Sequence, residues 1–293
     1  MSETDVFTIV DPQNGNLAFK IFSFTDGRQY DHIQRLNYHS IVILREGTAV
    51  LKADFSEYPI QGNCLLYFAP YQPFMLDDAK YIQGTVINFH SDFFCIYKHH
   101  AEIACNGVLF NNVYQRPYIL LTEELLADFM TLADQMKQEM QNKALAQHES
   151  LVSYLKILLI KATRIKISQC PGNEKETQPG SEHFVIQHLK DAVEKHYKTL
   201  HSPSEYANLL NVPVNTLARI SKLHFNKTLT HLISERIVIE AKRELYLTSK
   251  AVKQIADELG FSDEYYFSRF FKNNADVSPR QFREAAGFAR AEG

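Results

Sequence analysis

The stretch QIADELGFSDEYYFSRFFKNNADVSPRQFR (254–283) decides the fold of the C-terminal third, because it repeats a pattern already present in EYANLLNVPVNTLARISKLHFNKTLTHLI (205–233). Self-similarity at a fixed offset indicates two copies of one structural unit. The matching pairs, at an offset of 49 residues and then of 50 after one insertion, are Ala207 and Ala256, Leu210 and Leu259, Arg219 and Arg269, Lys222 and Lys272, and Thr228 and Ser278.

Each copy predicts a helix-turn-helix. A small Ala, with an apolar residue three positions later, lets the first helix pack closely against the second. Asn211 and Gly260 follow, and both residue types tolerate the left-handed backbone of a tight turn between helices. The second helix then begins near Pro213 in the first copy and near Asp263 in the second, where residues that favour a helix start are expected.

The outer face of each second helix is the candidate DNA-contacting surface. Arg and Asn can make bidentate contacts with guanine and adenine in the major groove, whereas Lys, Ser and Thr suit phosphates. The candidates are Asn215, Thr216, Arg219 and Lys222 in the first copy, and Glu264, Tyr265, Ser268, Arg269 and Lys272 in the second. A single copy with such a face would equally fit ordinary helix packing and a solvated surface.

The segment between the copies, 230–248, predicts one unbroken helix of roughly 27 Å. With the width of the helix pairs, this length approaches the ~34 Å between successive major-groove segments on one side of a duplex. A single chain could therefore contact two adjacent segments. Residues 183–293 also carry a net charge of +3, against −6 for residues 1–182, and a basic segment on an acidic chain favours a polyanionic partner.

The composition excludes several other classes of protein. The 293 residues, 45% of them hydrophobic, are enough for two domains with sizeable cores. No run approaches the roughly 18 apolar residues of a membrane span, and the N-terminal residues 1–16 lack the apolar region of a secretory signal. The four cysteines form no CxxC pair, so we expect neither a disulfide framework nor a zinc site, and a cytoplasmic location.

The N-terminal half predicts short strands rich in β-branched and aromatic residues, with turns at sites such as Glu46-Gly47. No helical pattern alternates with these strands, so an antiparallel sandwich or small barrel is expected in place of a parallel sheet. The expected strands are 17–24, 39–45, 48–55, 63–69 and 85–89.

Three helices are expected after the strands. Residues 91–104 predict a short helix capped by Ser91, and residues 122–141 and 148–167 predict a helical hairpin whose apolar residues recur every three or four positions. One face of this hairpin should pack on the sheet, and the hairpin is the candidate surface for a homodimer. Residues 168–182, with two prolines, two glycines and no apolar run, predict a linker.

The segment 240–283 resembles the AraC-type (AraC/XylS) transcriptional regulators, through Ile255-Ala256, Leu259-Gly260-Phe261, 266–272 and Ser278-Pro279. The resemblance covers about a third of the chain. It implies an all-α, seven-helix domain with two helix-turn-helix motifs and contact with RNA polymerase, and it adds Ala218 to the DNA-contacting candidates. The chain departs from the family pattern where Gly is usual, at Asn226 and Asp276, and where a large apolar residue is usual, at Ser221.

Residues 47–76 resemble the cupin-type sensor domain common in that family, which implies a barrel that responds to a small-molecule effector. The candidate metal ligands, His32 and His39, do not alternate along one strand, and Phe74 stands where a metal-binding cupin has a later His. No metal and no cofactor are therefore expected. Tyr67, Tyr71 and Phe74 are candidates to line an effector cavity, and their alternative role is in the core.

These observations predict an α+β protein with two domains. A cupin-like sensor and dimerisation domain of residues 1–167 includes the hairpin of about 122–167, and a linker of residues 168–182 joins it to a DNA-binding domain of residues 183–293. The predicted function is a transcription regulator whose partners are double-stranded DNA, RNA polymerase, an effector and a second copy, and no membrane. The alternatives are a cupin-type enzyme, which would need a metal or acid–base set that the sequence lacks, and a scaffold that binds protein.

Overall fold

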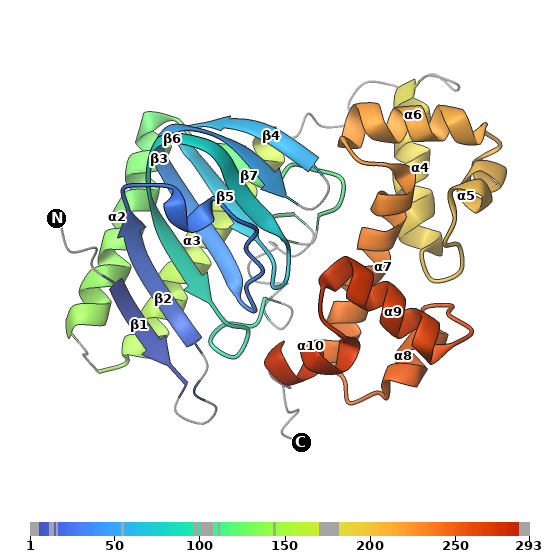
Figure 1. Cartoon of the computed structure of the whole chain (residues 1–293). Coiled ribbons are helices and arrows are strands. Elements are labelled where there is room, and N and C mark those ends of the chain that lie inside the picture. The colour runs from blue at the N-terminus through green and yellow to red at the C-terminus, as the bar shows by residue number, and fades with distance from the viewer. Residues whose placement is uncertain are drawn as a thin grey trace. The chain divides into compact units, whose positions relative to one another are not determined.

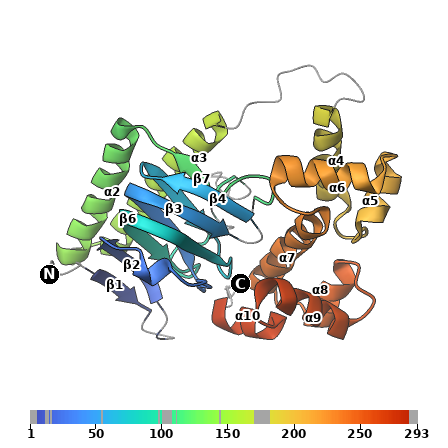
Figure 2. The ribbon, with the colours of Figure 1, turned by 45° about the horizontal axis from the view of Figure 1, so that its top comes forward.

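The computed structural model describes residues 6–11, 15, 17–53, 56–96, 99, 108–110, 112–142, 145–169 and 182–286. The chain divides into two compact units, residues 1–112 with 116–172 and residues 113–115 with 173–293. Figures 1 and 2 show strands and two long helices in the N-terminal unit and a group of helices in the C-terminal unit. No helix in the described ranges is long and apolar enough to cross a membrane.

One antiparallel sheet forms the centre of the N-terminal unit. Its strand order is β1-β2-β6-β3-β5-β7, and β4 pairs with β3 off this path. The strands are β1 (Val6–Val10), β2 (Leu17–Phe24), β3 (His39–Ala53), β4 (Ser56–Gln61), β5 (Cys64–Phe68), β6 (Phe74–Phe89) and β7 (Tyr118–Leu120), with a short 3-10 helix η1 (Arg28–Tyr30). An antiparallel sheet followed by a helical C-terminal region confirms the predicted α+β class.

The turn predicted at Gly47 is wrong, because β3 continues through this position as one strand. Its pairing with β6 shifts register three times between Leu44 and Val50, and Gly47 has a φ of +93°. A Cβ at Gly47 would lie 2.5 Å from the carbonyl oxygen of Lys80. The glycine therefore permits an irregular, closely paired stretch within a long strand, a pattern that the sequence does not distinguish from a hairpin turn.

Three strands were not predicted, and β6 begins at Phe74 instead of residue 85. β4 contains Pro59, which lies opposite Val50 of β3. A proline is accepted there because, among the described strands, β4 pairs only with β3, so the missing N–H interrupts no ladder on its other side. β7 has three residues, too few for a recognisable alternation.

The predicted hairpin forms as α2 (Glu123–Asn142) and α3 (Gln147–Gln169), which pack against each other and cover one face of the sheet (Figure 1). The predicted core residues of α3 are all buried, whereas Leu125 and Leu126 of α2 are only partly buried. A second hydrophobic cluster, which includes Phe68 and Phe74, lies on the opposite face. The alternation of side chains along each strand separates the two clusters.

The short helix predicted from Ser91 is not found over residues 91–96, which form turns, and most of residues 97–104 lie outside the described residues. The linker prediction also lies largely outside them. At its two ends, Gln169 still belongs to α3 and Glu182 begins the next helix. The Gln169 side chain accepts a hydrogen bond from the backbone N–H of Leu120 at 3.1 Å. This bond to β7 stabilises the last turn of α3, which extends past the predicted end at residue 167.

The described part of the C-terminal unit is helical, and its longest helix, α7, lies between two groups of shorter ones (Figures 1 and 2). Contacts join α7 to α4 and α6 towards one end and to α8, α9 and α10 towards the other. The helices are α4 (Glu182–His196), α5 (Pro203–Leu210), α6 (Val214–Phe225), α7 (Leu229–Leu247), α8 (Val252–Glu258), α9 (Glu264–Ala275) and α10 (Pro279–Ala286).

Candidate nucleic-acid interface

The two predicted recognition helices, α6 and α9, match residue by residue. Both are 12 residues long, and they begin 50 residues apart, at Val214 and Glu264, which is the offset of the sequence repeat in this part. Equivalent positions are buried in each: Leu217 and Phe267, Ser221 and Phe271, Phe225 and Ala275. Helices that bury the same positions expose the same positions, so the outer faces of α6 and α9 are equivalent.

The turns before these helices have the predicted conformation. Asn211 ends α5 with a φ of 54°, and Gly260 follows α8 with a φ of 78°, both in the left-handed region. The small residues Ala207 and Ala256 are buried, which lets each pair of helices approach closely. Leu259 is also buried, but Leu210 is half-buried.

The ends of the recognition helices show how two departures from the family pattern are accommodated. Asn226 and Asp276 follow α6 and α9 with φ values of 56° and 61°, a conformation that Asn and Asp tolerate better than most residues. The starts differ. The Asp263 carboxylate accepts hydrogen bonds from the backbone N–H groups of Tyr265 and Tyr266 at 3.2 and 2.9 Å, whereas Pro213 makes no side-chain cap.

The predicted DNA-contacting residues lie on the outer faces of α6 and α9. Thr216, Glu264 and Ser268 are half-buried, and the rest are exposed: Asn215, Ala218, Arg219, Lys222, Tyr265, Arg269 and Lys272. The exposure of Tyr265 reaches 84%, which is unusual for an aromatic side chain in a folded domain. The sequence reasoning omitted the equivalent exposed positions Leu223 and Asn273, although Leu223 follows Arg219 by four residues and so lies near it on the helix.

The charge of these faces is positive. Within the described ranges, Lys222, Arg269 and Lys272 form no ion pair, and the Arg269 guanidinium lies 5.9 Å from the Tyr266 ring centroid. The pKa of His231, in the first turn of α7, is lowered by partial burial and by the charges of Lys222 and Lys227. The same positive field would attract a phosphate group.

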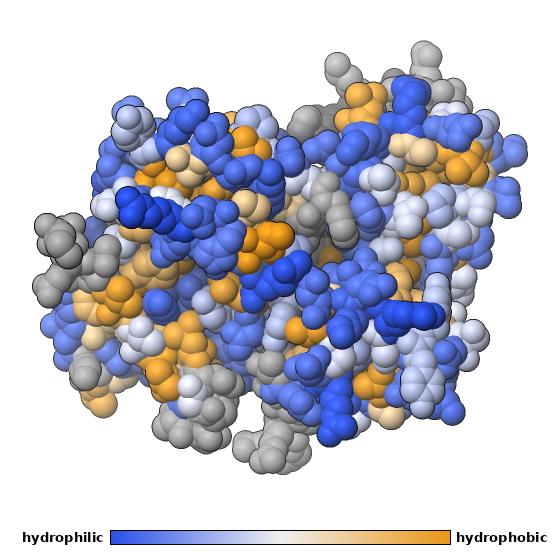
Figure 3. Space-filling model, viewed as in Figure 1, coloured by the Kyte–Doolittle hydropathy of each residue, from blue (hydrophilic) through white to orange (hydrophobic). Residues whose placement is uncertain are grey.

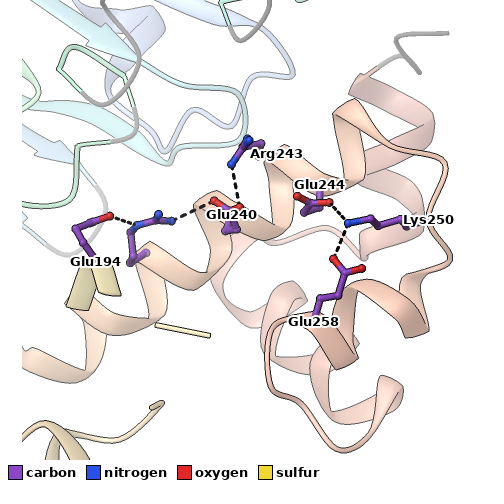
Figure 4. A network of polar contacts seen from close by, with 7 residues as sticks. Glu194, Glu240, Arg243, Glu244, Lys250 and Glu258 are labelled. Atoms are coloured by element: carbon purple, nitrogen blue, oxygen red, sulfur yellow. Dashed lines mark hydrogen bonds and ion pairs between the residues drawn. The ribbon is translucent and has the colours of Figure 1, made fainter. Parts of the chain in front are cut away.

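Ion pairs along α7 connect it to its neighbours (Figure 4). Arg236 donates to Glu194 of α4 at 2.8 Å and contacts Glu240 at 3.5 Å. Near the other end, Lys250 donates to Glu244 of α7 at 2.8 Å and to Glu258 of α8 at 2.6 Å. These pairs join both halves of the unit to α7. On the face seen in Figure 3, the surface over these helices is mainly hydrophilic with scattered hydrophobic residues.

The three candidate effector residues do not form one set. Tyr67 belongs to the hydrophobic cluster beneath α2 and α3, and its hydroxyl donates to the Arg116 carbonyl oxygen at 3.1 Å. Phe74 belongs to the cluster on the other face, where its ring stacks on that of Phe68 with the two ring centroids 3.7 Å apart. Tyr71 is buried with a φ of 60°. Tyr67 and Phe74 therefore lie on opposite sides of the sheet and do not face one common space, and contact of any of the three with an effector stays a prediction.

The two candidate metal ligands, His32 and His39, differ in their exposure and in their surroundings. His32 is exposed and its Nδ1 lies 2.9 Å from Asp31. His39 is buried against the Phe89 ring, and burial lowers its pKa to about 3, with a smaller contribution from His90. In the part of the chain that the structure describes, no group of three or more His, Cys, Asp or Glu residues could hold a metal ion.

Comparisons with known proteins agree with this geometry. Residues 206–285, which span both motifs, match the family described as a helix-turn-helix domain. The chain is 22% identical over 251 residues to the HTH-type transcriptional activator RhaS of Yersinia pestis, covering 84% of this chain and 87% of that protein. It is 30% identical over 150 residues to RhaS of Pectobacterium atrosepticum, covering 51% and 50%.

Solved structures with some likeness include ToxT from Vibrio cholerae O395, at 15% identity and a TM-score of 0.38 over 97% of both chains. Another is the C-terminal domain of AraT, a response regulator from Geobacillus stearothermophilus. It has 25% identity and a TM-score of 0.35, over 37% of this chain and 90% of that one.

Proposed function

We propose that this chain is a DNA-binding transcription regulator of the AraC type that reads two successive major-groove segments with α6 and α9. The observation that carries the proposal is the register match between these helices, because it presents two equivalent, basic, exposed faces on one compact unit. α7 has 19 residues and so spans roughly 28 Å. That length, with the width of the flanking helices, suits the ~34 Å repeat of the duplex.

Two arginines test this assignment. We expect Arg219→Ala and Arg269→Ala each to weaken binding to a specific site by about 1–3 kcal/mol, because each removes a side chain able to contact a base bidentately. The site is obtained by selecting bound duplexes from random DNA with the intact chain, and affinity is measured by fluorescence anisotropy. Lys195→Ala, which removes one exposed charge from α4, is the control.

Salt dependence gives a second reading of the same assignment. The wild-type affinity should fall steeply with salt because bound Lys and Arg release counterions from the phosphates. Lys222→Ala and Lys272→Ala should weaken binding to all sequences and reduce the salt slope by about one each. Wild-type affinity in both arginine variants would contradict the assigned helix faces.

We also propose that the chain activates transcription, as the name given to the RhaS relatives says of them, and that it does so by contact with RNA polymerase. The test is transcription by purified bacterial RNA polymerase from a promoter that carries the selected site. An increase in transcript on adding the intact chain supports activation, and a decrease contradicts it.

A homodimer through α3 is the proposed role of the hairpin. Ile157 and Ile167 are 44% and 57% exposed, and with Ile160 and Arg164 they follow one stripe of the helix at spacings of three and four residues. Exposed isoleucines on a helix favour a second apolar surface. Ile157→Glu should therefore convert a dimer to a monomer in sedimentation, whereas Gln138→Glu on α2 should not.

We further propose an effector site in the N-terminal unit, on the side of the sheet that carries Phe68 and Phe74. Ser40 lies opposite both Phe68 and Asn88 in the pairing of β3 with its neighbours. The Ser40 hydroxyl and the side-chain amide oxygen (Oδ1) of Asn88 are buried without a hydrogen-bond partner in the described structure, and such groups favour a polar ligand. In a metabolite panel, a true effector should raise the melting temperature of the wild type more than that of Ser40→Ala.

A further inference from the structure

The two helix-turn-helix motifs are joined by more than α7. The loop after α4, residues 197–202, lies against the turn between α8 and α9. A Cβ built on Gly260 of that turn would overlap the Lys198 carbonyl oxygen and lie 3.4 Å from Nε2 of His201. Only glycine allows this approach, and Gly260 also needs the left-handed conformation, with a φ of 78°.

An aromatic pair forms the other part of this contact. The His201 and Phe261 rings lie 4.7 Å apart between centroids, and Phe261 is 5% exposed. Nε2 of His201 is buried and has no hydrogen-bond partner among the described residues. His201 therefore contributes its ring surface to the contact and not a hydrogen bond from Nε2.

Both sides of the contact are held in place. On the loop side, the Glu205 carboxylate accepts from the backbone N–H groups of His201 and Ser202 at 3.0 and 2.8 Å. The Tyr206 hydroxyl donates to the Leu200 carbonyl oxygen at 3.1 Å. These bonds fix the loop to the start of α5, the first helix of the first motif.

On the turn side, Phe261 packs against the second recognition helix. Its ring centroid lies 5.2 Å from that of Phe267 and 5.1 Å from that of Phe270, both on α9. The backbone N–H of Phe261 donates to the Ala256 carbonyl oxygen at 2.9 Å, which fixes the turn to α8. A shift of the loop would therefore displace Phe261 and, through its packing on Phe267 and Phe270, change the position of α9.

We propose that this inter-motif contact, made by Lys198, His201, Gly260 and Phe261, fixes the orientation of α9 relative to the first motif and so sets the operator spacing that the protein accepts. Apart from this contact, the two motifs are connected through α7, on which α4 and α6 pack towards one end and α8, α9 and α10 towards the other. A bend or twist of α7 between these two groups would change the orientation of α9. A second contact away from α7 opposes such a change. His201 and Gly260 are positioning residues in this role, and the role rests on the proposed reading of two groove segments.

The contact has a clear consequence for DNA. Inserting one base pair between the two segments moves the second by about 3.4 Å and rotates it by about 34°. A chain with fixed motifs loses one set of base contacts on that duplex, so its affinity should fall by about tenfold or more. In a chain with independent motifs, the second motif can reorient to follow the shifted segment. Such a chain should bind the operator of native spacing more weakly, and its affinity should fall less when the base pair is inserted.

The experiment measures the affinity of the full chain for the selected operator and for the same operator with one base pair inserted. The quantity compared between variants is the ratio of the first affinity to the second. We expect His201→Ala and Gly260→Asn to reduce the ratio to about threefold or less. Asn tolerates the left-handed backbone, as Asn211 shows at the equivalent turn, so Gly260→Asn tests the close approach and not the turn. His201→Phe, which keeps a ring, and Asn211→Gly, at the matched turn, should keep the wild-type ratio.

Hydrogen exchange without DNA gives a reading that does not depend on the proposed function. His201→Ala should speed exchange at the amides of Gly260 and Phe261, and His201→Phe should not. A wild-type ratio in both His201→Ala and Gly260→Asn would overturn the proposal, as would unchanged exchange in His201→Ala. If Gly260→Asn does not fold, the two His201 variants decide alone. A wild-type chain that binds no duplex but shows the expected exchange contradicts the proposed function, and with it the spacing role.

Discussion

The two helix-turn-helix motifs share a backbone but differ in the chemistry of one corner. Where α6 meets α7, the first motif buries Ser221, whose hydroxyl donates to the Lys227 carbonyl oxygen at 2.9 Å. The Lys227 ammonium in turn donates to Glu235 at 2.7 Å, with side chains 5% and 12% exposed. This corner of the first motif is polar and charged.

The same corner of the second motif is aromatic. Phe271, which takes the place of Ser221 one repeat later, is fully buried. Its ring centroid lies 5.8 Å from that of Phe282 on α10 and 6.0 Å from that of Phe267. The comparison shows that the features the two motifs share are the left-handed residue at the turn and the small buried Ala. The corner therefore accepts either a buried ion pair with a hydrogen-bonded hydroxyl or an aromatic cluster.

The largest expected effect is in the aromatic corner. Phe271→Ala should lower the free energy of unfolding by about 3–5 kcal/mol, because it removes a fully buried ring and leaves a cavity. Urea denaturation followed by circular dichroism measures the change. Tyr265→Ala on the exposed face of the same helix is the control and should cost no more than about 0.5 kcal/mol. Equal losses in the two variants would contradict the buried role of Phe271.

The charged corner should respond next. Lys227→Met should cost about 3 kcal/mol, because it leaves the mostly buried Glu235 carboxylate without its ammonium partner. Combining Lys227→Met with Glu235→Leu should recover most of that loss, since apolar residues can replace a buried ion pair. If the double variant is no more stable than the single one, the corner depends on the charges themselves. The same denaturation measurement decides this.

A smaller effect is expected at the residue that distinguishes the corners. Ser221→Ala should cost about 1 kcal/mol, because it removes one hydrogen bond and leaves the Lys227 carbonyl oxygen without that donor. Ala218→Ser, which introduces the residue found at the equivalent position of α9, should change stability by less than about 0.5 kcal/mol. A loss in the control as large as that in Ser221→Ala would indicate that α6 tolerates no change at all.

The smallest effect is a pH dependence confined to the first motif. The pKa of His231 in the folded chain is below its ordinary value because of partial burial and then the charges of Lys222 and Lys227. The unfolded chain therefore binds more protons. The stability from neutral His231 is complete above about pH 6.5, the unfolded value, and is lost as pH falls towards the lower folded value.

His231→Gln removes this dependence. The second motif already has Gln281 at this position, where its side-chain oxygen accepts from the backbone N–H of Ser278 at 3.0 Å. The variant should thus gain stability over the wild type as pH falls from 7.5 to 5.5, as followed by denaturation at each pH. Parallel curves for the two proteins would contradict the cause assigned to the pKa of His231.

Local signals predicted the motifs well. The left-handed residues at Asn211 and Gly260, the exposed faces of α6 and α9 and the buried stripe of α3 all follow from residue type and helical spacing. Long-range pairing was harder. Gly47 has the sequence signature of a turn, but the backbone of β6 passes beside it and keeps β3 continuous.

The two like-built helices, the hairpin and the antiparallel class were predictable from the residues alone, because turns and apolar spacing act within a few residues. The positions of Tyr67 and Phe74 on opposite faces were not, since they depend on which strands pair. Nor was the approach of Gly260 to Lys198, residues separated by most of the domain. A contact between distant segments depends on how the intervening helices pack, and no local pattern records that packing.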